Sequence, residues 1–129
     1  MLKLFSKNDR GKFRYHFAHV LAFNMTAVIL GHWKPKYIFH DFEKPWLMLL
    51  WGGDYKRVQT WHRKHNRHHL EYPDETKIDW EALVIDWESS RFTKSASPLD
   101  ARGEFWKARD KFNDYKYVRF MRACDKLGV

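Results

Sequence analysis

The sequence predicts an all-α protein, a single compact domain of about five helices. Apolar residues recur at three- and four-residue steps along much of the 129-residue chain, which is the spacing of one face of an α-helix. No segment shows the apolar–polar alternation of a half-buried strand. The length is typical of one domain, and an aromatic content of 18% provides large side chains for its core.

The first two expected elements are separated by a glycine. A helix is expected from about Lys12 to Leu30, ending at Gly31. The second, strongly apolar segment covers residues 36–54, where Pro45 should end or kink any helix begun at its start. Gly52 and Gly53 should terminate this segment.

The remaining elements follow from capping signals. Asp54 can cap a third helix that runs to Tyr72. Thr76 and Asp79 have capping-box spacing, and the fourth helix is expected at about 77–92. A loop at 95–98 precedes a long amphipathic helix at about 99–126. The single domain 1–129 thus has a core at about 12–94 and a C-terminal helix.

Composition narrows the functional classes. A formal charge of +8 suggests an anionic partner such as a nucleotide, a nucleic acid or a phosphorylated metabolite, although solubility alone would also explain it. Cys124 is the only cysteine, so an intramolecular disulfide and a cysteine-based zinc motif are excluded. The apolar stretch Phe17–Leu30 is too short to span a bilayer. A reducing cytoplasm and no membrane partner are therefore expected.

The adjacent residues His40 and Asp41 are the first candidates for chemistry. They follow an apolar segment, and burying an unpaired carboxylate is costly. Because Pro45 indicates a turn nearby, both side chains can reach one ion. The other interpretation, in which Asp41 caps the next helix and His40 is a hydrogen-bonded core residue, stays open.

Two more candidates lie on predicted helices. His19 shares the apolar face of the first helix with His16. Asp86 lies mid-helix within an apolar segment, where a carboxylate needs a partner. Asp79 carries the same local sequence but lies in a first turn, where a carboxylate complements the helix dipole. Asp86 is therefore the better ligand candidate.

Residues 61–73, WHRKHNRHHLEYP, contain four of the eight histidines. On a continuous helix, His62, His65, Asn66 and His69 share one face, and His68 points away from it. Histidines on one face can bind a common ion or line a common pocket. The alternative, a solvated basic helix, would scatter the histidines without regard to face.

The order of these residues resembles the HD-domain superfamily of metal-dependent phosphohydrolases. Its members carry a histidine on an early helix, a His-Asp doublet and a later aspartate, which match His19, His40, Asp41 and Asp86 here. The resemblance implies an HD-domain-like fold in which these four residues bind one divalent metal. Members with two metals add histidines from intervening helices. The segment HDFEK looks like the His-Asp-x-x-Lys form, which would make Lys44 a phosphate-contacting residue.

The chain is also similar to a small family of uncharacterised bacterial and phage proteins related to this fold. The likeness covers about residues 15–94 and includes His19, the doublet, Lys44, His62, Asn66, His68, His69, Glu71, Tyr72 and Asp86. Glu43 departs from that pattern, which has serine before the lysine. His16 and His65 lie outside it. His62 and His69 are closer together than the extra ligands of the two-metal members, which favours phosphate binding or proton transfer over a second metal for them.

Together these observations predict a metal-dependent phosphohydrolase that acts on a nucleotide or related phosphoester. Two histidines and two carboxylates suit Mn, Fe, Co, Ni or Zn, as one or two ions. The predicted metal ligands are His19, His40, Asp41 and Asp86. The predicted catalytic residues are Lys44, His62 and His69, of which a histidine would protonate the leaving oxygen. Asn66, Arg67 and His68 are expected to bind substrate, and Arg67 would help to neutralise its phosphate.

Two other classes stay open. HD-like folds with extra histidines include two-iron oxygenases. A non-catalytic helical module that binds nucleotide or nucleic acid is the third reading, supported by basic residues on the last helix: Lys107, Arg109, Lys111, Lys116, Arg119 and Arg122. The solvated side of an amphipathic helix explains that basic face better. A homo-oligomer is an open possibility, and the expected location is a bacterial cytoplasm or a phage-infected host.

Overall fold

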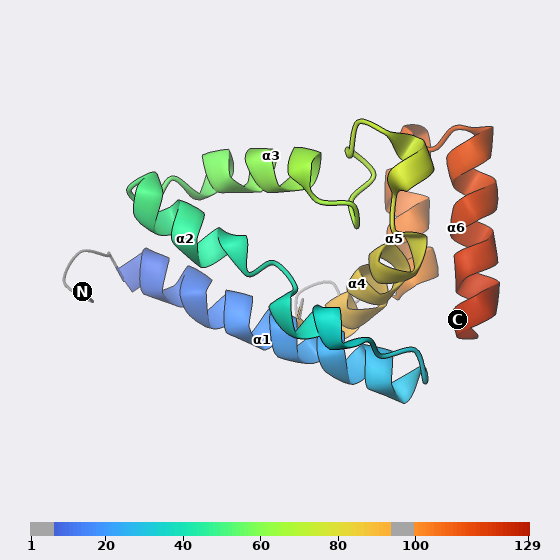
Figure 1. The fold of residues 1–129 in the computed structure, drawn as a ribbon, viewed down its shortest axis with the longest axis horizontal. Helices are drawn as coiled ribbons and strands as arrows, with labels where there is room; N and C mark the ends of the chain where they lie inside the picture. The colour runs from blue at the N-terminus through green and yellow to red at the C-terminus, as the bar shows by residue number, and fades with distance from the viewer. Residues whose placement is uncertain (1–6, 94–99) are drawn as a thin grey trace.

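The computed structural model describes residues 7–93 and 100–129, and within them the all-α prediction is confirmed, with no strand. Six α-helices are present in the described residues (Figure 1): α1 (Lys7–Ile29), α2 (Glu43–Leu50), α3 (Tyr55–His65), α4 (Trp80–Thr93), α5 (Ala101–Ala108) and α6 (Asp114–Leu127). Three short 3-10 helices join them: η2 (Pro35–Phe39), η3 (Glu75–Lys77) and η4 (Arg109–Lys111). None of the described helices has the length and apolar character needed to cross a membrane. The predicted loop at 95–98 lies outside the described residues.

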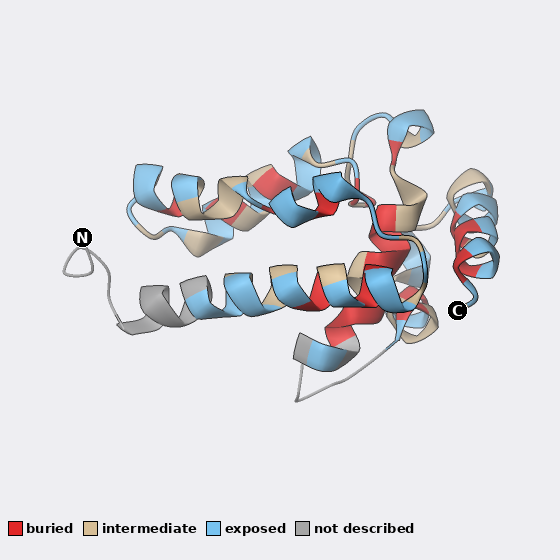
Figure 2. Ribbon diagram, turned by 60° about the horizontal axis from the view of Figure 1, so that its bottom comes forward, coloured by how far each residue is buried: buried red, intermediate tan, exposed pale blue. Residues whose placement is uncertain are grey.

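Helix α4 is the centre of the core. It packs against α1, α5 and α6, and its residues Leu83, Val84 and Ile85 are fully buried. Figure 2 shows the buried residues gathered along this helix. Three successive buried positions cover most of a helix circumference, so α4 is enclosed on nearly all sides. A carboxylate on α4 therefore has to find its partners inside the protein.

Helix α1 has two contrasting faces. Phe23 and Ala27 are fully buried on the helix that packs against α4. The opposite face is apolar but exposed, and consists of Phe17, Leu21, Met25, Val28 and Ile29.

Helices α2 and α3 pack against each other across a turn in which Gly52 and Gly53 have φ of 61° and 85°. Glycine enters this left-handed region without steric cost, so the predicted stop at these residues is confirmed.

Pro45 does not break a helix. Helix α2 begins at Glu43, which places Pro45 in its first turn, where the missing N–H has no helical partner to lose. The chain reaches α2 from η2 through His40 and Asp41. The predicted change of direction near Pro45 is therefore made before the proline.

The third helix is shorter than predicted. It ends at His65, and Asn66 has extended backbone angles, with φ −115° and ψ 131°. The Asn66 amide donates to the His62 carbonyl oxygen (3.0 Å), and such local side-chain bonds compete with helix continuation. Residues 66–79 then form a loop, and the Asp79 N–H donates to the Arg67 carbonyl oxygen (2.6 Å) within it. The prediction that His68 points away from His62 assumed a helix beyond residue 65 and is wrong, whereas His69 lies beside His62 as predicted, although it lies on a loop.

The C-terminal helix is interrupted. It consists of α5, η4 and α6, and the side chain of Asn113 accepts a hydrogen bond from Lys116 N–H (2.8 Å) as the cap of α6. Phe105 lies 4.8 Å from Phe112 and 5.4 Å from Phe120, between ring centroids. Fifteen residues of straight helix would separate Phe105 from Phe120 by about 22 Å. Burial of these rings in one cluster therefore requires the break.

Helix α4 also begins later than predicted. Asp79 accepts a hydrogen bond from Ala82 N–H (3.1 Å) and caps α4, while Asp74 accepts from Thr76 N–H (3.1 Å) at η3. Thr76 therefore caps neither helix. Both aspartates satisfy amide groups that a helix start leaves without partners.

Candidate metal centre

Seven side chains from five segments meet between α1, α3 and α4. His19 comes from α1 and His62 from α3, whereas Asp86 comes from α4. His40 and Asp41 occupy the turn between η2 and α2, and His68 and His69 follow the end of α3. The chain thus brings together all four predicted metal ligands and all three histidines 62, 68 and 69.

Asp41 owes its place in the cluster to an unusual backbone conformation. It is the one non-glycine residue with positive φ (57°) in the described part of the chain, and it is 4% exposed. Asp and Asn adopt this left-handed region more readily than other residues, but it still costs energy. The turn directs the carboxylate inward instead of toward the solvent.

The first donor group contains His19, His40 and Asp86. The Oδ1 atom of Asp86 lies 2.8 Å from His19 Nε2 and 3.1 Å from His40 Nε2. Asp41 adjoins this group, because each of its two oxygens lies 3.5 Å from one of these Nε2 atoms. His40 is held from behind by Phe23, whose ring stacks on it with centroids 3.7 Å apart.

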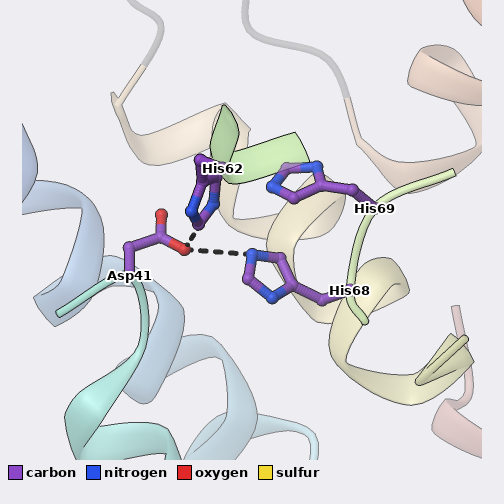
Figure 3. Close-up of side chains that lie close together, drawn as sticks. All are labelled: Asp41, His62, His68 and His69. Carbon is purple, nitrogen blue, oxygen red and sulfur yellow. Dashed lines mark ion pairs between the residues drawn. The ribbon is translucent and has the colours of Figure 1, made fainter. Parts of the chain in front are cut away.

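The second donor group contains Asp41, His62, His68 and His69 (Figure 3). Asp41 Oδ1 lies 2.9 Å from His62 Nε2 and 3.0 Å from His68 Nε2. The ring of His69 lies 4.7 Å from that of His62 and 4.3 Å from that of His68, between centroids. Asp41 is therefore shared by both donor groups.

The donors of the second group are close without being hydrogen-bonded. Asp41 Oδ1 and the Nε2 atoms of His62, His68 and His69 are all buried, and none has a hydrogen-bond partner of acceptable geometry. Buried polar atoms left without partners are costly and rare. A cation between them would satisfy the oxygen and the nitrogens together, since carboxylate and neutral imidazole are both metal ligands. These buried His and Asp groups can hold a metal ion.

Electrostatics keep the carboxylates ionised. Burial alone would raise the pKa of Asp41, but His40, His62 and His68 outweigh it and hold that pKa well below its usual range. Burial likewise opposes ionisation of Asp86, yet the adjacent His19 and His40 keep its pKa well below normal. Two buried negative charges thus face the cluster.

The histidines differ in protonation. Burial lowers the pKa of His40 and lowers that of His69 to about 2, so both rings are neutral and each has a lone pair for a metal. Burial also opposes protonation of His19 and His62, but Asp86 raises the pKa of His19. Asp41 and Glu43 do the same for His62. A metal would have to displace protons from these two rings.

A cleft of about 250 Å³ opens onto the cluster. His19, Asp41, His69 and Asp86 form part of its wall, and its basic residues are Lys44, Arg63 and Lys111. Lys44 Nζ lies 3.4 Å from Asp41 Oδ2, and Lys111 pairs with Glu71 (3.3 Å). The predicted Lys44 therefore lies beside the donors, while Arg63 and Lys111 were not predicted as site residues.

Arg67 lies elsewhere. Its Nε donates to the Lys77 carbonyl oxygen (2.7 Å), and it lines a different cleft that also contains Asn66, His68 and Asp41. Lys44 and Arg67 thus line two different clefts. Asn66 and His68, both predicted to bind substrate, contact Glu43 and Asp41 instead.

His16 and His65 lie outside the donor groups, although each was predicted to share a helix face with a site histidine. His65 is exposed and its ring stacks on Trp61 with centroids 4.1 Å apart. His16 is half-buried, and burial lowers its pKa to about 4. The pattern that omitted His16 and His65 and included His68 was the better guide, because it did not depend on helix geometry beyond residue 65.

Comparisons with known proteins leave the family undetermined. The chain matches no protein-family model, and no match was found among curated proteins or among solved structures. The resemblance to the HD-domain superfamily consequently stays a prediction.

Proposed function

We propose that this chain is a metal-dependent phosphohydrolase with an HD-domain-like fold, acting on a nucleotide or a related phosphoester. The observation that carries the proposal is the second donor group: one carboxylate oxygen and three imidazole nitrogens are buried together without hydrogen-bond partners. A divalent transition metal held there supplies a water of lowered pKa and polarises a phosphoryl oxygen. Nitrogen and carboxylate donors favour Mn, Fe, Co, Ni or Zn.

The two donor groups support two ions. His19, His40 and Asp86 would hold one, His62, His68 and His69 the other, and Asp41 would belong to both. This assigns His62, His68 and His69 to metal binding. The sequence left a second-metal role open for His62 and His69 beside proton transfer, and predicted substrate contact for His68. A carboxylate that belongs to both donor groups would lower the repulsion between two cations held close together.

The cleft beside the donors supports an anionic substrate. Lys44 is placed to neutralise a phosphate next to the cluster, and Arg63 lines the same cleft. Charge-assisted bonds from such groups fix the phosphate and favour the charge that develops during transfer. A cytoplasmic location and a nucleotide as the substrate belong to this proposal as well.

Elemental analysis together with a phosphoester panel tests the proposal. We expect one or two transition-metal ions per chain, and metal-dependent release of phosphate from mononucleotides, cyclic nucleotides or a chromogenic phosphodiester. His68→Ala should reduce both metal content and turnover at least tenfold. The matched control is His65→Ala, three residues earlier, because that ring lies on the exposed side of α3. A wild-type protein that binds no metal, or equal behaviour of the two variants, would contradict the proposal.

Two alternatives have distinct outcomes. Metal-dependent oxygen consumption without phosphate release would indicate a two-iron oxygenase, whose iron the same histidine and carboxylate donors suit. Salt-sensitive binding of nucleic acid without turnover would indicate a binding module. The basic C-terminal residues give the latter little support, since Lys111 pairs with Glu71 and Lys116 donates to the Leu70 carbonyl oxygen (3.2 Å).

A further inference from the structure

His62 is the most enclosed residue of the cluster. Its side chain is 0% exposed, and its two ring nitrogens face two different carboxylates. Nε2 lies 2.9 Å from Asp41 Oδ1, and Nδ1 contacts Oε1 of Glu43. Only the Nδ1 side has the geometry of a hydrogen bond.

Glu43 is fixed by more than this one contact. Its Oε1 also accepts a hydrogen bond from Asn66 Nδ2 (2.7 Å), and Asn66 bonds back to the His62 carbonyl oxygen (3.0 Å). The side chain of Glu43 is 20% exposed. Glu43, His62 and Asn66 thus form a closed network that joins the start of α2 to the end of α3.

A neutral imidazole has one N–H and one lone pair. If Nδ1 carries the proton and donates to Glu43, the lone pair of His62 is on Nε2 and points toward Asp41. The opposite tautomer would leave two acceptors, Nδ1 and the carboxylate of Glu43, facing each other. Asn66 Nδ2 also lies 3.0 Å from Nδ1, but its two hydrogens have acceptors in Glu43 Oε1 and the His62 carbonyl oxygen. The hydrogen bond to Glu43 therefore selects the tautomer that presents Nε2 to the second donor group.

We propose that Glu43 is a positioning residue that holds His62 in the Nδ1–H tautomer and orients its Nε2 toward the ion bound by Asp41, His68 and His69. This inference rests on the proposed metal centre. A carboxylate behind a ligand histidine orients the ring and raises its basicity, and loss of such a partner typically weakens metal binding by about 10–100-fold.

The competing explanation is purely structural. A protonated His62 between two carboxylates would join α2 to α3 as a buried ion pair, with no metal involved. In that case removing Glu43 lowers the stability of the metal-free protein and leaves metal affinity unchanged. The two explanations therefore differ in which measurement responds.

Cobalt(II) titration of the metal-free protein separates them, with competition by a chelator and the visible cobalt spectrum as readouts. Glu43→Ala should weaken the binding of one of two Co(II) ions roughly 10–100-fold, and Glu43→Asp should restore part of the loss. The matched control is Glu75→Ala, because Glu75 also accepts a hydrogen bond from an asparagine side chain, that of Asn113 (2.9 Å), away from the cluster. This control should bind Co(II) as the wild type does.

The failures are distinguishable. Wild-type protein that binds no Co(II) overturns the metal centre and this inference with it. Wild-type protein that binds two Co(II) ions, with Glu43→Ala and Glu43→Asp binding both equally well, overturns only the role of Glu43. If the alanine variant does not fold, the aspartate variant carries the test. Nitrogen-15 NMR of the zinc-loaded wild type supplies a second readout, and a protonated Nε2 on His62 would also refute the inference.

Discussion

Asp41 joins the backbone geometry of the site to its chemistry. It has a left-handed backbone, contributes one oxygen to three histidine contacts and places the other 3.4 Å from Lys44 Nζ. Strained conformations persist where the surroundings fix them, and they concentrate at functional sites. The unfavourable backbone conformation of Asp41 places its carboxylate between the two donor groups.

Replacing Asp41 by asparagine tests the charge without disturbing the turn. Asparagine tolerates the left-handed region, so Asp41→Asn should fold, yet the lost charge should weaken metal binding by more than the roughly 10–100-fold typical of partners behind a ligand. Metal content by elemental analysis measures this. Asp125→Asn, at a surface position 77% exposed, is the control. Undiminished metal content in Asp41→Asn would remove Asp41 from the centre.

Cys124 gives a prediction that does not involve the site. Burial raises the pKa of its thiol to about 11, and the side chain is fully buried. Because the thiolate is the reactive form, the folded protein at pH 8 should react with a thiol reagent at least about 10-fold more slowly than unfolded protein. A stopped-flow assay with and without denaturant measures both rates. Equal rates would show that packing of α6 onto the core does not shield this thiol.

At the scale of elements, helix ends decide which side chains reach the site. Helix α3 stops at His65, and the loop that follows turns His68 and His69 toward Asp41. Helix α4 starts at Trp80 behind its cap, Asp79, and this start sets the register that directs Asp86 toward His19. Hydrogen bonds at two helix termini thus control three of the donors.

Asp79→Ala should destabilise the protein by about 0.5–2 kcal/mol at pH 7, because the variant loses the α4 cap and the 2.9 Å contact with Lys36. Burial opposes ionisation of Asp79, but Lys36 and the Ala82 N–H outweigh it and lower its pKa. A carboxylate with a lowered folded pKa stabilises above its unfolded pKa, about 3.9, and loses that contribution as pH falls through the folded value.

The difference between wild type and Asp79→Ala should therefore shrink below about pH 4. Urea unfolding at pH 7 and at pH 3 measures it. Asp74→Ala is the control, because Asp74 caps only the short η3 and its loss should matter less. A difference that grows on acidification would contradict this account of Asp79.

At the scale of the whole molecule, most of the donors lie in the part of the chain that precedes α4. Six donors precede α4: His19, His40, Asp41, His62, His68 and His69. Asp86 lies on α4 itself. The helices α5 and α6 pack on α4 at the far end of the molecule (Figure 1). They support α4, and Glu104, Ala108 and Lys111 close the side of the cleft.

The exposed apolar face of α1 predicts self-association, which the sequence left open. Residues 15–33 contain no Asp, Glu, Lys or Arg, and Phe17, Leu21, Met25, Val28 and Ile29 are exposed. A stable interface buries about 800 Å² per partner, and five large side chains with their surroundings provide area of that order. The chain carries a formal charge of +8. A contact through this uncharged face of α1, here called the seam, would let a second copy bind without bringing like charges together.

We therefore expect a dimer by sedimentation equilibrium at micromolar concentration. Leu21→Glu combined with Val28→Glu should raise the dissociation constant at least 10-fold, because it places charges in the seam. Val118→Glu, on the exposed side of α6, should leave the dimer intact. A monomeric wild type, or binding of the α1 face to lipid vesicles in place of dimerisation, would refute the prediction.

The sequence by itself determined the helical class, the stop at Gly52 and Gly53, and four of the residues that gather at the site. Helical periodicity, glycine and the cost of burying a lone carboxylate are local properties, so they can be read without a fold. The same reasoning picked His19, His40, Asp41 and Asp86, which the structure brings within contact distance of one another.

Only the tertiary structure decided how the histidines divide. No glycine or proline follows His65 to end α3 there, and a longer helix would have turned His68 away and kept His65 in the site. Packing of Phe105, Phe112 and Phe120 into one cluster broke the C-terminal helix in the same way. The contacts of Glu43 could not be predicted from the sequence, because its partners His62 and Asn66 lie 19 and 23 residues away. Contacts between distant segments set the ends of helices, and here those ends set which side chains meet.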